Sequence, residues 1–330
     1  MNTFAGKYDF LFLIHKEAVE GKGEDSFYCC ADPLDGQSAA VAVFDGSGGA
    51  GSRIHEEFGG HTEAYIASRC LSGAMCDWYH ENGKGHWRSA VQLRDSLKTS
   101  FEKAFSLCSE KSDRNRMIMG SMVKSFPTTA AIAYAQEDPE GILVHIMWAG
   151  DSRVYLMDRE GLAQLTEDDL DGQDALANLY DDGVMTNMLS SDEEVKLHAK
   201  SFRISGPTLI FAATDGCFGY FPTPMDFEYV ILSSLDRAGR PDRFKENLKA
   251  WFTEYAGDDF AMGLMSFYHG DFRKLKKTYA GRTRYIYNRY IEPLSRCREE
   301  NRQDTETFTA ALWEDYRTGY ERYLQKENES

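Results

Sequence analysis

The stretch SAAVAVFDGSGG, residues 38–49, sets a pattern that recurs along the chain. Its apolar run over 38–44 predicts a buried β-strand. Asp45 follows the run directly and precedes glycines, which permit a tight turn. Three further apolar runs carry an aspartate at one end: Asp151 follows 142–149, Asp215 follows 207–214, and Asp258 stands before 260–267. The sequence therefore predicts several strands whose ends carry carboxylates.

The connection QEDPEG (136–141) favours an antiparallel hairpin between the runs 128–135 and 142–149, because Asp-Pro-Glu-Gly is typical of turns. Other strand candidates are 8–14, 26–30, 152–157 and 195–204. Helical patterns cover 54–107, with breaks at its glycines, and also 225–237 and 242–256. Strands and helices do not alternate regularly. We therefore predict packed antiparallel sheets flanked by helices rather than a doubly wound parallel sheet.

The composition limits the class of protein. With 330 residues, 42% of them hydrophobic and 27% charged, the chain has a globular composition. No apolar run approaches the roughly 20 residues that span a bilayer, and the N-terminus lacks a secretory pattern. The seven cysteines show no zinc-like spacing, which favours reduced thiols. We expect a soluble, cytoplasmic protein.

The net charge of −16 is unevenly distributed. Residues 268–330 carry 13 basic and 11 acidic residues, which leaves −18 on residues 1–267. Such an acidic body argues against nucleic acid and anionic membranes as partners. Beyond residue 267 the apolar spacing becomes helical, so we predict a domain over 1–267 and a C-terminal helical extension over 268–330. Seven basic residues between Arg273 and Arg289 are typical either of a docking surface or of a solvated helix face.

Carboxylates at strand ends can meet at one edge of a sandwich although they are distant in sequence. Besides the four aspartates, Glu24 and Asp25 precede another strand candidate. Acids brought that close repel one another, and a hard divalent cation with oxygen ligands relieves the repulsion. The alternative is that each aspartate caps a turn. A second alternative is the G-x-G-x-x-G match at 46–51, but the second parallel strand of a dinucleotide-binding fold is missing.

Seven fragments in order resemble the metal-dependent protein phosphatases of the type 2C serine/threonine family, in their bacterial form. They are GEDS (23–26), VFDGSGG (43–49), TTAA (128–131), WAGDSRVYLM (148–157), LT with acids (165–169), FAATDG (211–216) and DDFA (258–261). The resemblance covers roughly residues 8–267. It implies an α+β fold, a four-layer α-β-β-α sandwich of two antiparallel sheets flanked by helices. It also implies a centre of two Mn²⁺ or Mg²⁺ ions and a third, weaker metal site.

The resemblance also implies roles for single residues. Asp45 would bridge both metals and the carbonyl of Gly46 would bind one of them, while Asp215 and Asp258 would bind the other. Glu24 and Asp25 would hold metal-bound waters, and Asp151 would serve the third site. Two such ions make hydroxide available near neutral pH for in-line attack on phosphorus, so no protein nucleophile is needed.

Two departures from the family pattern concern the substrate. Position 20 is Glu, where many members have an arginine that grips phosphate, and Lys22 is the nearest cationic substitute. Ser47 stands where eukaryotic members have a general-acid histidine; His55 and His61 are candidates to replace it, or solvated helical residues. We assign Asp45, Asp215, Asp258 and Lys22 to catalysis.

We therefore expect a phosphoserine and phosphothreonine phosphatase whose partners are a phosphoprotein and a cognate kinase. The alternative is a catalytically weak relative that binds phosphoproteins or regulates a partner. The acidic stretch 167–182 and the following 182–194 correspond to a mobile flap of the family, or to a solvated loop. The sequence does not give the substrate identity or the oligomeric state.

Overall fold

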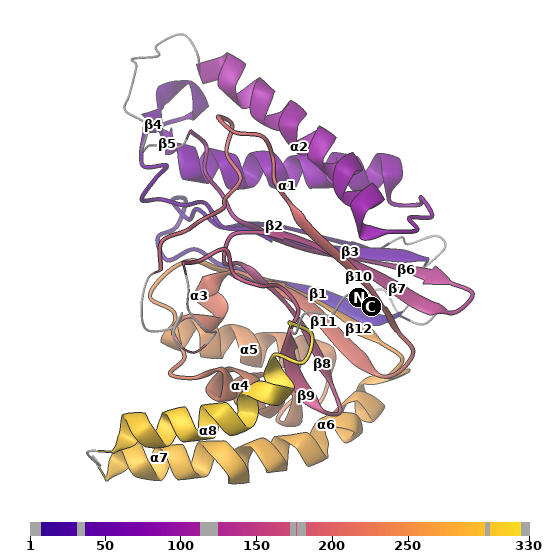
Figure 1. The fold of residues 1–330 in the computed structure, drawn as a ribbon, viewed down its shortest axis with the longest axis vertical. Coiled ribbons are helices and arrows are strands. Elements are labelled where there is room, and N and C mark those ends of the chain that lie inside the picture. Colours follow the sequence, from indigo (N-terminus) through magenta and orange to yellow (C-terminus); the bar gives the residue numbers. More distant parts are fainter. Residues whose placement is uncertain are drawn as a thin grey trace.

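The computed structural model describes residues 8–31, 37–112, 125–171, 176, 183–300 and 304–324. Two five-stranded antiparallel sheets form its centre (Figure 1). In spatial order the first sheet contains β1 (Tyr8–Lys16), β12 (Phe260–Phe267), β11 (Thr208–Ala213), β8 (Arg153–Asp158) and β9 (Gly161–Gln164). The second contains β10 (His198–Ile204), β7 (Gly141–Ala149), β6 (Ala130–Asp138), β3 (Ser38–Phe44) and β2 (Ser26–Ala31).

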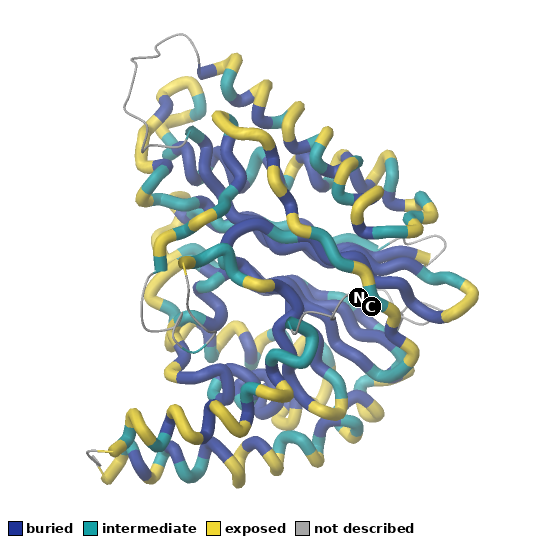
Figure 2. The backbone as a smooth tube through the Cα atoms, in the orientation of Figure 1, coloured by how far each residue is buried: buried dark blue, intermediate teal, exposed yellow. Residues whose placement is uncertain are grey.

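Strand β3 shows why the sheets stack. Every one of its residues is buried, and its side chains alternate between two hydrophobic clusters. Val41 belongs to the cluster between the sheets, and Phe44 to the cluster under the helices. Gly263 of β12 lies so close to Val41 that a Cβ atom there would be 2.8 Å from the valine Cβ. The inner strands of both sheets are buried on their two faces, whereas β10 at the edge of the second sheet is mostly half-buried or exposed (Figure 2).

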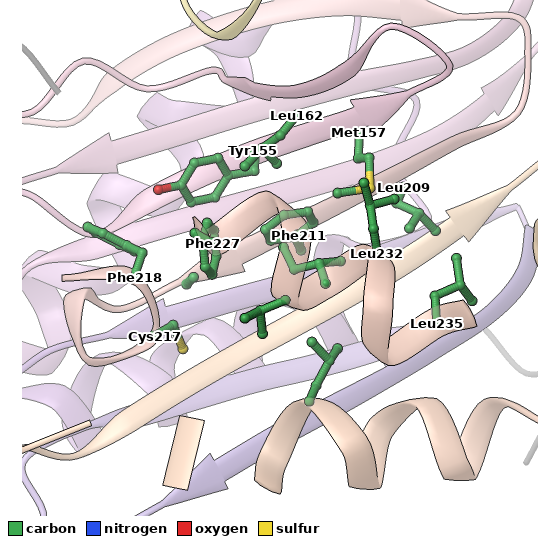
Figure 3. Packing of buried hydrophobic residues seen from close by; sticks show 14 of the residues in the cluster. Tyr155, Met157, Leu162, Leu209, Phe211, Cys217, Phe218, Phe227, Leu232 and Leu235 are labelled. Atoms are coloured by element: carbon green, nitrogen blue, oxygen red, sulfur yellow. The ribbon is translucent and has the colours of Figure 1, made fainter. Parts of the chain in front are cut away.

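Helices cover both outer faces of the sandwich (Figure 1). α1 (Glu63–Asn82) and α2 (Ala90–Ser112) lie on the second sheet, and α4 (Pro224–Asp236) and α5 (Pro241–Tyr255) on the first; the short α3 (Asp215–Phe218) follows β11. Figure 3 shows Phe227 of α4 among Tyr155 and Phe211 of the first sheet. The predicted four-layer α+β sandwich is confirmed.

The helical expectation over residues 54–62 is wrong. This segment contains β4 (Ile54–His55), a single 3₁₀ turn (Glu56–Phe58) and β5 (His61–Thr62), which pairs with β4. Gly59 has a φ of 77°, in the left-handed region, which ends the turn. α1 begins only after Thr62, whose hydroxyl accepts a hydrogen bond from the backbone N–H of Tyr65 at 3.1 Å.

The C-terminal extension is helical, as predicted. α6 (Phe272–Ile286) continues through a π-helical turn (Tyr287–Ile291) into α7 (Glu292–Glu299), and α8 (Thr305–Tyr320) runs back along it (Figure 1). Apolar side chains of these helices join the cluster that also contains α4, α5 and the first sheet. The division at residue 267 stays a prediction, because the two parts share one core. In the part of the chain that the structure describes, no helix has the length and apolarity to cross a membrane.

Candidate metal centre

The aspartates at the strand ends lie at one end of the sandwich and line a cavity of about 300 Å³. Each comes from a different strand: Asp45 follows β3, Asp151 follows β7, Asp215 follows β11, and Asp258 precedes β12. The loop before β2 adds Glu24 and Asp25. All seven residues that the sequence assigns to metal binding are among those that line the cavity: Glu24, Asp25, Asp45, Gly46, Asp151, Asp215 and Asp258.

The glycines beside these acids are required by close contacts. The backbone N–H of Gly46 donates to the carbonyl of Glu24 at 3.3 Å, and a Cβ on Gly46 would overlap the carbonyl oxygen of Ala64 in α1. Gly150 has a φ of 91°, which other residues rarely adopt. The turns that present Asp45 and Asp151 therefore depend on glycine.

Neighbouring groups hold the carboxylates in place. The hydroxyl of Thr214 donates to Asp25 Oδ2 at 2.7 Å, and that of Thr62 donates to Glu24 Oε1 at 2.5 Å. The backbone N–H of Glu24 donates to Asp259 Oδ2 at 2.5 Å, so the second aspartate of the 258–261 motif fixes the loop that carries Glu24. The orientation of the acidic side chains is thus set by the surrounding chain.

The acids in the cavity repel one another. Burial, followed by the charges of neighbouring carboxylates, raises the pKa of Asp25 and of Asp45. Burial also raises the pKa of Asp215, although a hydrogen bond with Asp45 opposes the rise. For Asp151, burial and the charges of Asp215 and Asp168 raise the pKa to about 7. The described residues that line the cavity include no lysine, arginine or histidine.

This donor set fits hard divalent cations. Carboxylate oxygens and a backbone carbonyl are ligands that Mg²⁺ and Mn²⁺ accept, whereas zinc sites favour cysteine and histidine. Cations would also supply the positive charge that the buried acids lack. Among the described residues, no three acidic, histidine or cysteine side chains are already close enough to enclose an ion. The number of ions therefore stays a prediction.

The predicted phosphate-binding lysine is not at the cavity. Lys22 and Glu20 are exposed, and neither is among the residues that line the cavity. Arg69 of α1, which sequence reasoning did not single out, also lies outside the lining; its Nη2 is 3.2 Å from Glu17 Oε1, in the loop before Glu24. Its guanidinium stacks on Tyr65 at 3.5 Å, and its charge lowers the pKa of Glu24 against the larger effect of burial. The helical spacing of Tyr65 and Arg69 was the signal available in the sequence.

The two histidine candidates for a general acid also lie outside the lining. His55 is buried between two carboxylates, with Nδ1 2.9 Å from Glu57 and Nε2 2.7 Å from Glu63. His61 stacks on Tyr65 with ring centroids 3.7 Å apart. The two carboxylates hold His55 in a structural hydrogen-bond network. Ser47, in contrast, does line the cavity.

The acids after Leu165 support the cavity from outside. Arg153 is buried, and its Nη2 is 2.6 Å from Asp168 Oδ2. Asp169 Oδ2 accepts a hydrogen bond from the backbone N–H of Gly150 at 2.9 Å. These acids thus position the turn that carries Asp151. Within the expected flap, residues 172–175 and 177–182 lie outside the described residues, while Met185 lines the cavity.

Comparison with known proteins agrees with this arrangement. Residues 20–253 match the family described as protein phosphatase 2C. The serine/threonine phosphatase PstP/Ppp of Mycobacterium tuberculosis superposes with a TM-score of 0.54 at 14% identity, over 79% of this chain and 99% of that one. Stp1 of Staphylococcus aureus gives 0.56 at 14% identity, over 78% and 94%.

A PstP catalytic domain in complex with two manganese ions gives a TM-score of 0.53 at 16% identity, over 78% of this chain and 98% of that one. At these low sequence identities, the structural similarity shows a shared fold and nothing further. None of the curated proteins matches the sequence.

Proposed function

The chain belongs to the protein phosphatase 2C family, whose members are hydrolases, and we propose that it removes phosphate from phosphoserine and phosphothreonine in proteins with the help of Mn²⁺ or Mg²⁺. The observation that carries this proposal is the cavity in which acids from five strand ends meet without a basic residue among the described lining. A phosphoprotein is then the substrate, and a cognate kinase supplies it.

In this proposal Asp45, Gly46, Asp215 and Asp258 hold the metal pair, Glu24 and Asp25 hold its water ligands, and Asp151 serves a third site. When bound, the metal ions supply Lewis-acid stabilisation of the phosphate charge and an activated water as the nucleophile. Buried acids suit this task because their repulsion in the absence of cations favours cation binding.

The chain's own residues orient the acids. Thr214 donates to Asp25 and leaves the other carboxylate oxygen of Asp25 for the cavity. Thr62 does the same for Glu24 from the start of α1. Fixed orientation lowers the reorganisation that the site undergoes during the reaction, which is a main contribution of an enzyme to electrostatic catalysis.

We propose Arg69 as the residue that attracts the substrate phosphate, while Lys22 contributes at longer range from the exposed loop. Arg69 is already oriented by Tyr65 and Glu17, and a phosphate dianion competes with the Glu17 carboxylate for its guanidinium. An arginine gives bidentate contacts to phosphate that a lysine does not. Replacement of Arg69 by lysine should therefore raise KM for a phosphopeptide more than it lowers kcat.

Hydrolysis of an aryl phosphate and of a phosphothreonine peptide with Mn²⁺ tests the proposal. We expect turnover that a chelator abolishes and that Asp45→Asn and Asp215→Asn each remove. Asp77→Asn, an exposed acid on α1, is the matched control and should retain activity. No turnover in the wild type, or equal turnover in the cavity variants, would contradict the proposal.

The second candidate is a phosphoprotein-binding module with weak catalysis. It is favoured by Ser47 at the general-acid position and by the position of Lys22 outside the cavity lining. Calorimetry with Mn²⁺ and with a phosphothreonine peptide distinguishes the two candidates. Tight binding of both with negligible turnover would support the binding module.

A further inference from the structure

Two thiols face each other in the helical layer that covers the second sheet. Cys70 of α1 and Cys108 of α2 have their Sγ atoms 2.8 Å apart, as a thiol–thiol hydrogen bond. A disulfide has a sulfur–sulfur distance of about 2.05 Å, so bond formation requires a movement of less than about 1 Å. Both residues are free cysteines in this structure.

The surroundings make the pair asymmetric. The hydrogen bond with Cys70, and the nearby charge of Lys111, lower the pKa of Cys108, while the same hydrogen bond and burial raise the pKa of Cys70. Cys70 also donates a hydrogen bond to the carbonyl of Ala104 at 3.3 Å. Cys108 is 7% exposed and Cys70 is partly exposed, which admits a small oxidant but not a protein active site. The lower pKa makes Cys108 the thiol that ionises first, and Cys70 lies in position to resolve an oxidised Cys108.

We propose that Cys70 and Cys108 form a redox modification site, where a hydroperoxide closes a reversible disulfide between α1 and α2. The thiol of Cys108 loses its proton to solvent, and its sulfur attacks the peroxide oxygen–oxygen bond, which breaks. The sulfur takes one oxygen as a sulfenic acid, and the other leaves as hydroxide or alkoxide, which takes up a proton from solvent and becomes water or alcohol. The sulfur of Cys70 then attacks the sulfenic sulfur and loses its proton, and the second oxygen leaves as water. In total two thiols are oxidised and one peroxide is reduced.

The bond would tie α1, which contacts two of the loops that line the cavity, to a second helix. α1 begins beside Thr62, which binds Glu24, and its residue Ala64 packs against Gly46. Cys70 lies on the same helix, less than two turns after Ala64. The oxidised protein would therefore have the cavity-side helix fixed to α2. This inference rests on the thiol geometry and does not depend on the proposed function.

Treatment of the purified full-length protein with hydrogen peroxide tests the inference. We expect the loss of two of the seven titratable thiols and a decrease in mass of about 2 Da. Peptide mapping should identify a Cys70–Cys108 link that dithiothreitol removes. The midpoint of thermal unfolding should rise by about 5 °C, because the bond closes a long loop of the unfolded chain.

Two variants separate this pair from the other thiols. In Cys70→Ser the sulfenic acid of Cys108 has no partner, so we expect overoxidation, with a gain of about 32 Da for the sulfinic acid. Cys76→Ser is the matched control on α1 and should form the same link as the wild type. A link between Cys30 and Cys76, a link between two molecules, or seven unchanged thiols would each overturn the proposal.

Discussion

Two groups of carboxylates differ in what neutralises their charge. In the cavity, Asp25, Asp45 and Asp215 face one another, and the described lining contains no cation. On α4, Glu228 is fully buried and binds the guanidinium of Arg282 through two hydrogen bonds, of 2.7 and 2.9 Å. The hydroxyl of Tyr316 in α8 donates to the same carboxylate at 2.7 Å.

The difference distinguishes a structural acid from a functional one. The acid of α4 has its charge and its hydrogen bonds supplied by the chain, so it holds α4, α6 and α8 together. The acids of the cavity have hydrogen-bond donors but no basic residue beside them in the described lining. The positive charge that balances them must therefore come from outside the chain. Burial alone does not separate the two groups, because Asp25 is 3% exposed and Glu228 is 0% exposed. The identity of the partner is therefore the informative observation.

The largest effect should follow from a change in the cavity. Asp215→Asn preserves the shape of the side chain but removes one ligand charge, so Mn²⁺-dependent turnover should fall by about 10³-fold or more, roughly 4 kcal/mol of transition-state stabilisation. In the presence of a chelator the free energy of unfolding should not decrease, because one source of repulsion is gone. Steady-state assays and urea unfolding measure the two quantities. A variant that loses several kcal/mol of stability would make Asp215 a structural acid.

The converse change is Arg282→Met, which leaves Glu228 buried with an unpaired charge. We expect a loss of about 3 kcal/mol in the free energy of unfolding, at the low end for a buried pair because Arg282 is 15% exposed. The exposed Arg284 of the same helix provides the control, Arg284→Met. The double variant Glu228→Gln/Arg282→Met should recover most of the loss, and an equal loss in the double variant would show that packing, not charge, is responsible.

Metal ions should stabilise the folded protein through the acids of the cavity and not through Glu228 and Arg282. At a Mn²⁺ concentration 100 times Kd, binding to the folded state adds about 2.7 kcal/mol to the free energy of unfolding. Arg282→Met should keep this gain and Asp45→Asn should lose it. Thermal unfolding with and without a chelator provides the measurement; an equal gain in both variants would place the metal elsewhere.

The smallest expected effect on stability concerns His198, the partner of Asp169, because the charge of a histidine changes with pH. Burial alone would raise the pKa of Asp169, but its hydrogen bonds, above all the one with His198 at 2.8 Å, outweigh burial, so the pKa is lowered. The same hydrogen bond raises the pKa of His198 above 6.5. The raised histidine pKa gives stability that is complete below pH 6.5 and is lost as the pH rises through the folded value. The neighbouring charge of Glu167 acts in the same direction, and Trp148 stacks on the ring.

Because His198 is 47% exposed, this contribution should stay below about 1 kcal/mol. The difference in unfolding free energy between the wild type and His198→Ala should be larger at pH 6 than at pH 8. Urea titrations at the two pH values measure it, and a difference independent of pH would mean that the ring acts only through its contact with Trp148.

The sequence predicted the strands and the cavity acids for a physical reason. Apolar runs that end in aspartate and glycine are local patterns, and local patterns survive in a single sequence. The charge partners were not predictable in this way, because Arg282 and Glu228 meet only in the folded chain. Lys22 illustrates the same limit: it is close to Glu24 in sequence, whereas Arg69 reaches the same loop from a helix.

The pairing of β1 with β12 has a consequence for the synthesis of the protein. β1 precedes the other described strands in sequence and lies at the edge of its sheet, where β12 is its hydrogen-bonded neighbour among the described strands. The ribosome therefore releases the apolar β1 about 250 residues before the strand that covers it, and Asp258 arrives at the same late moment. Until then the nascent chain has an exposed edge and an incomplete acidic cavity. The acidic cavity is thus complete only in chains whose sandwich has closed.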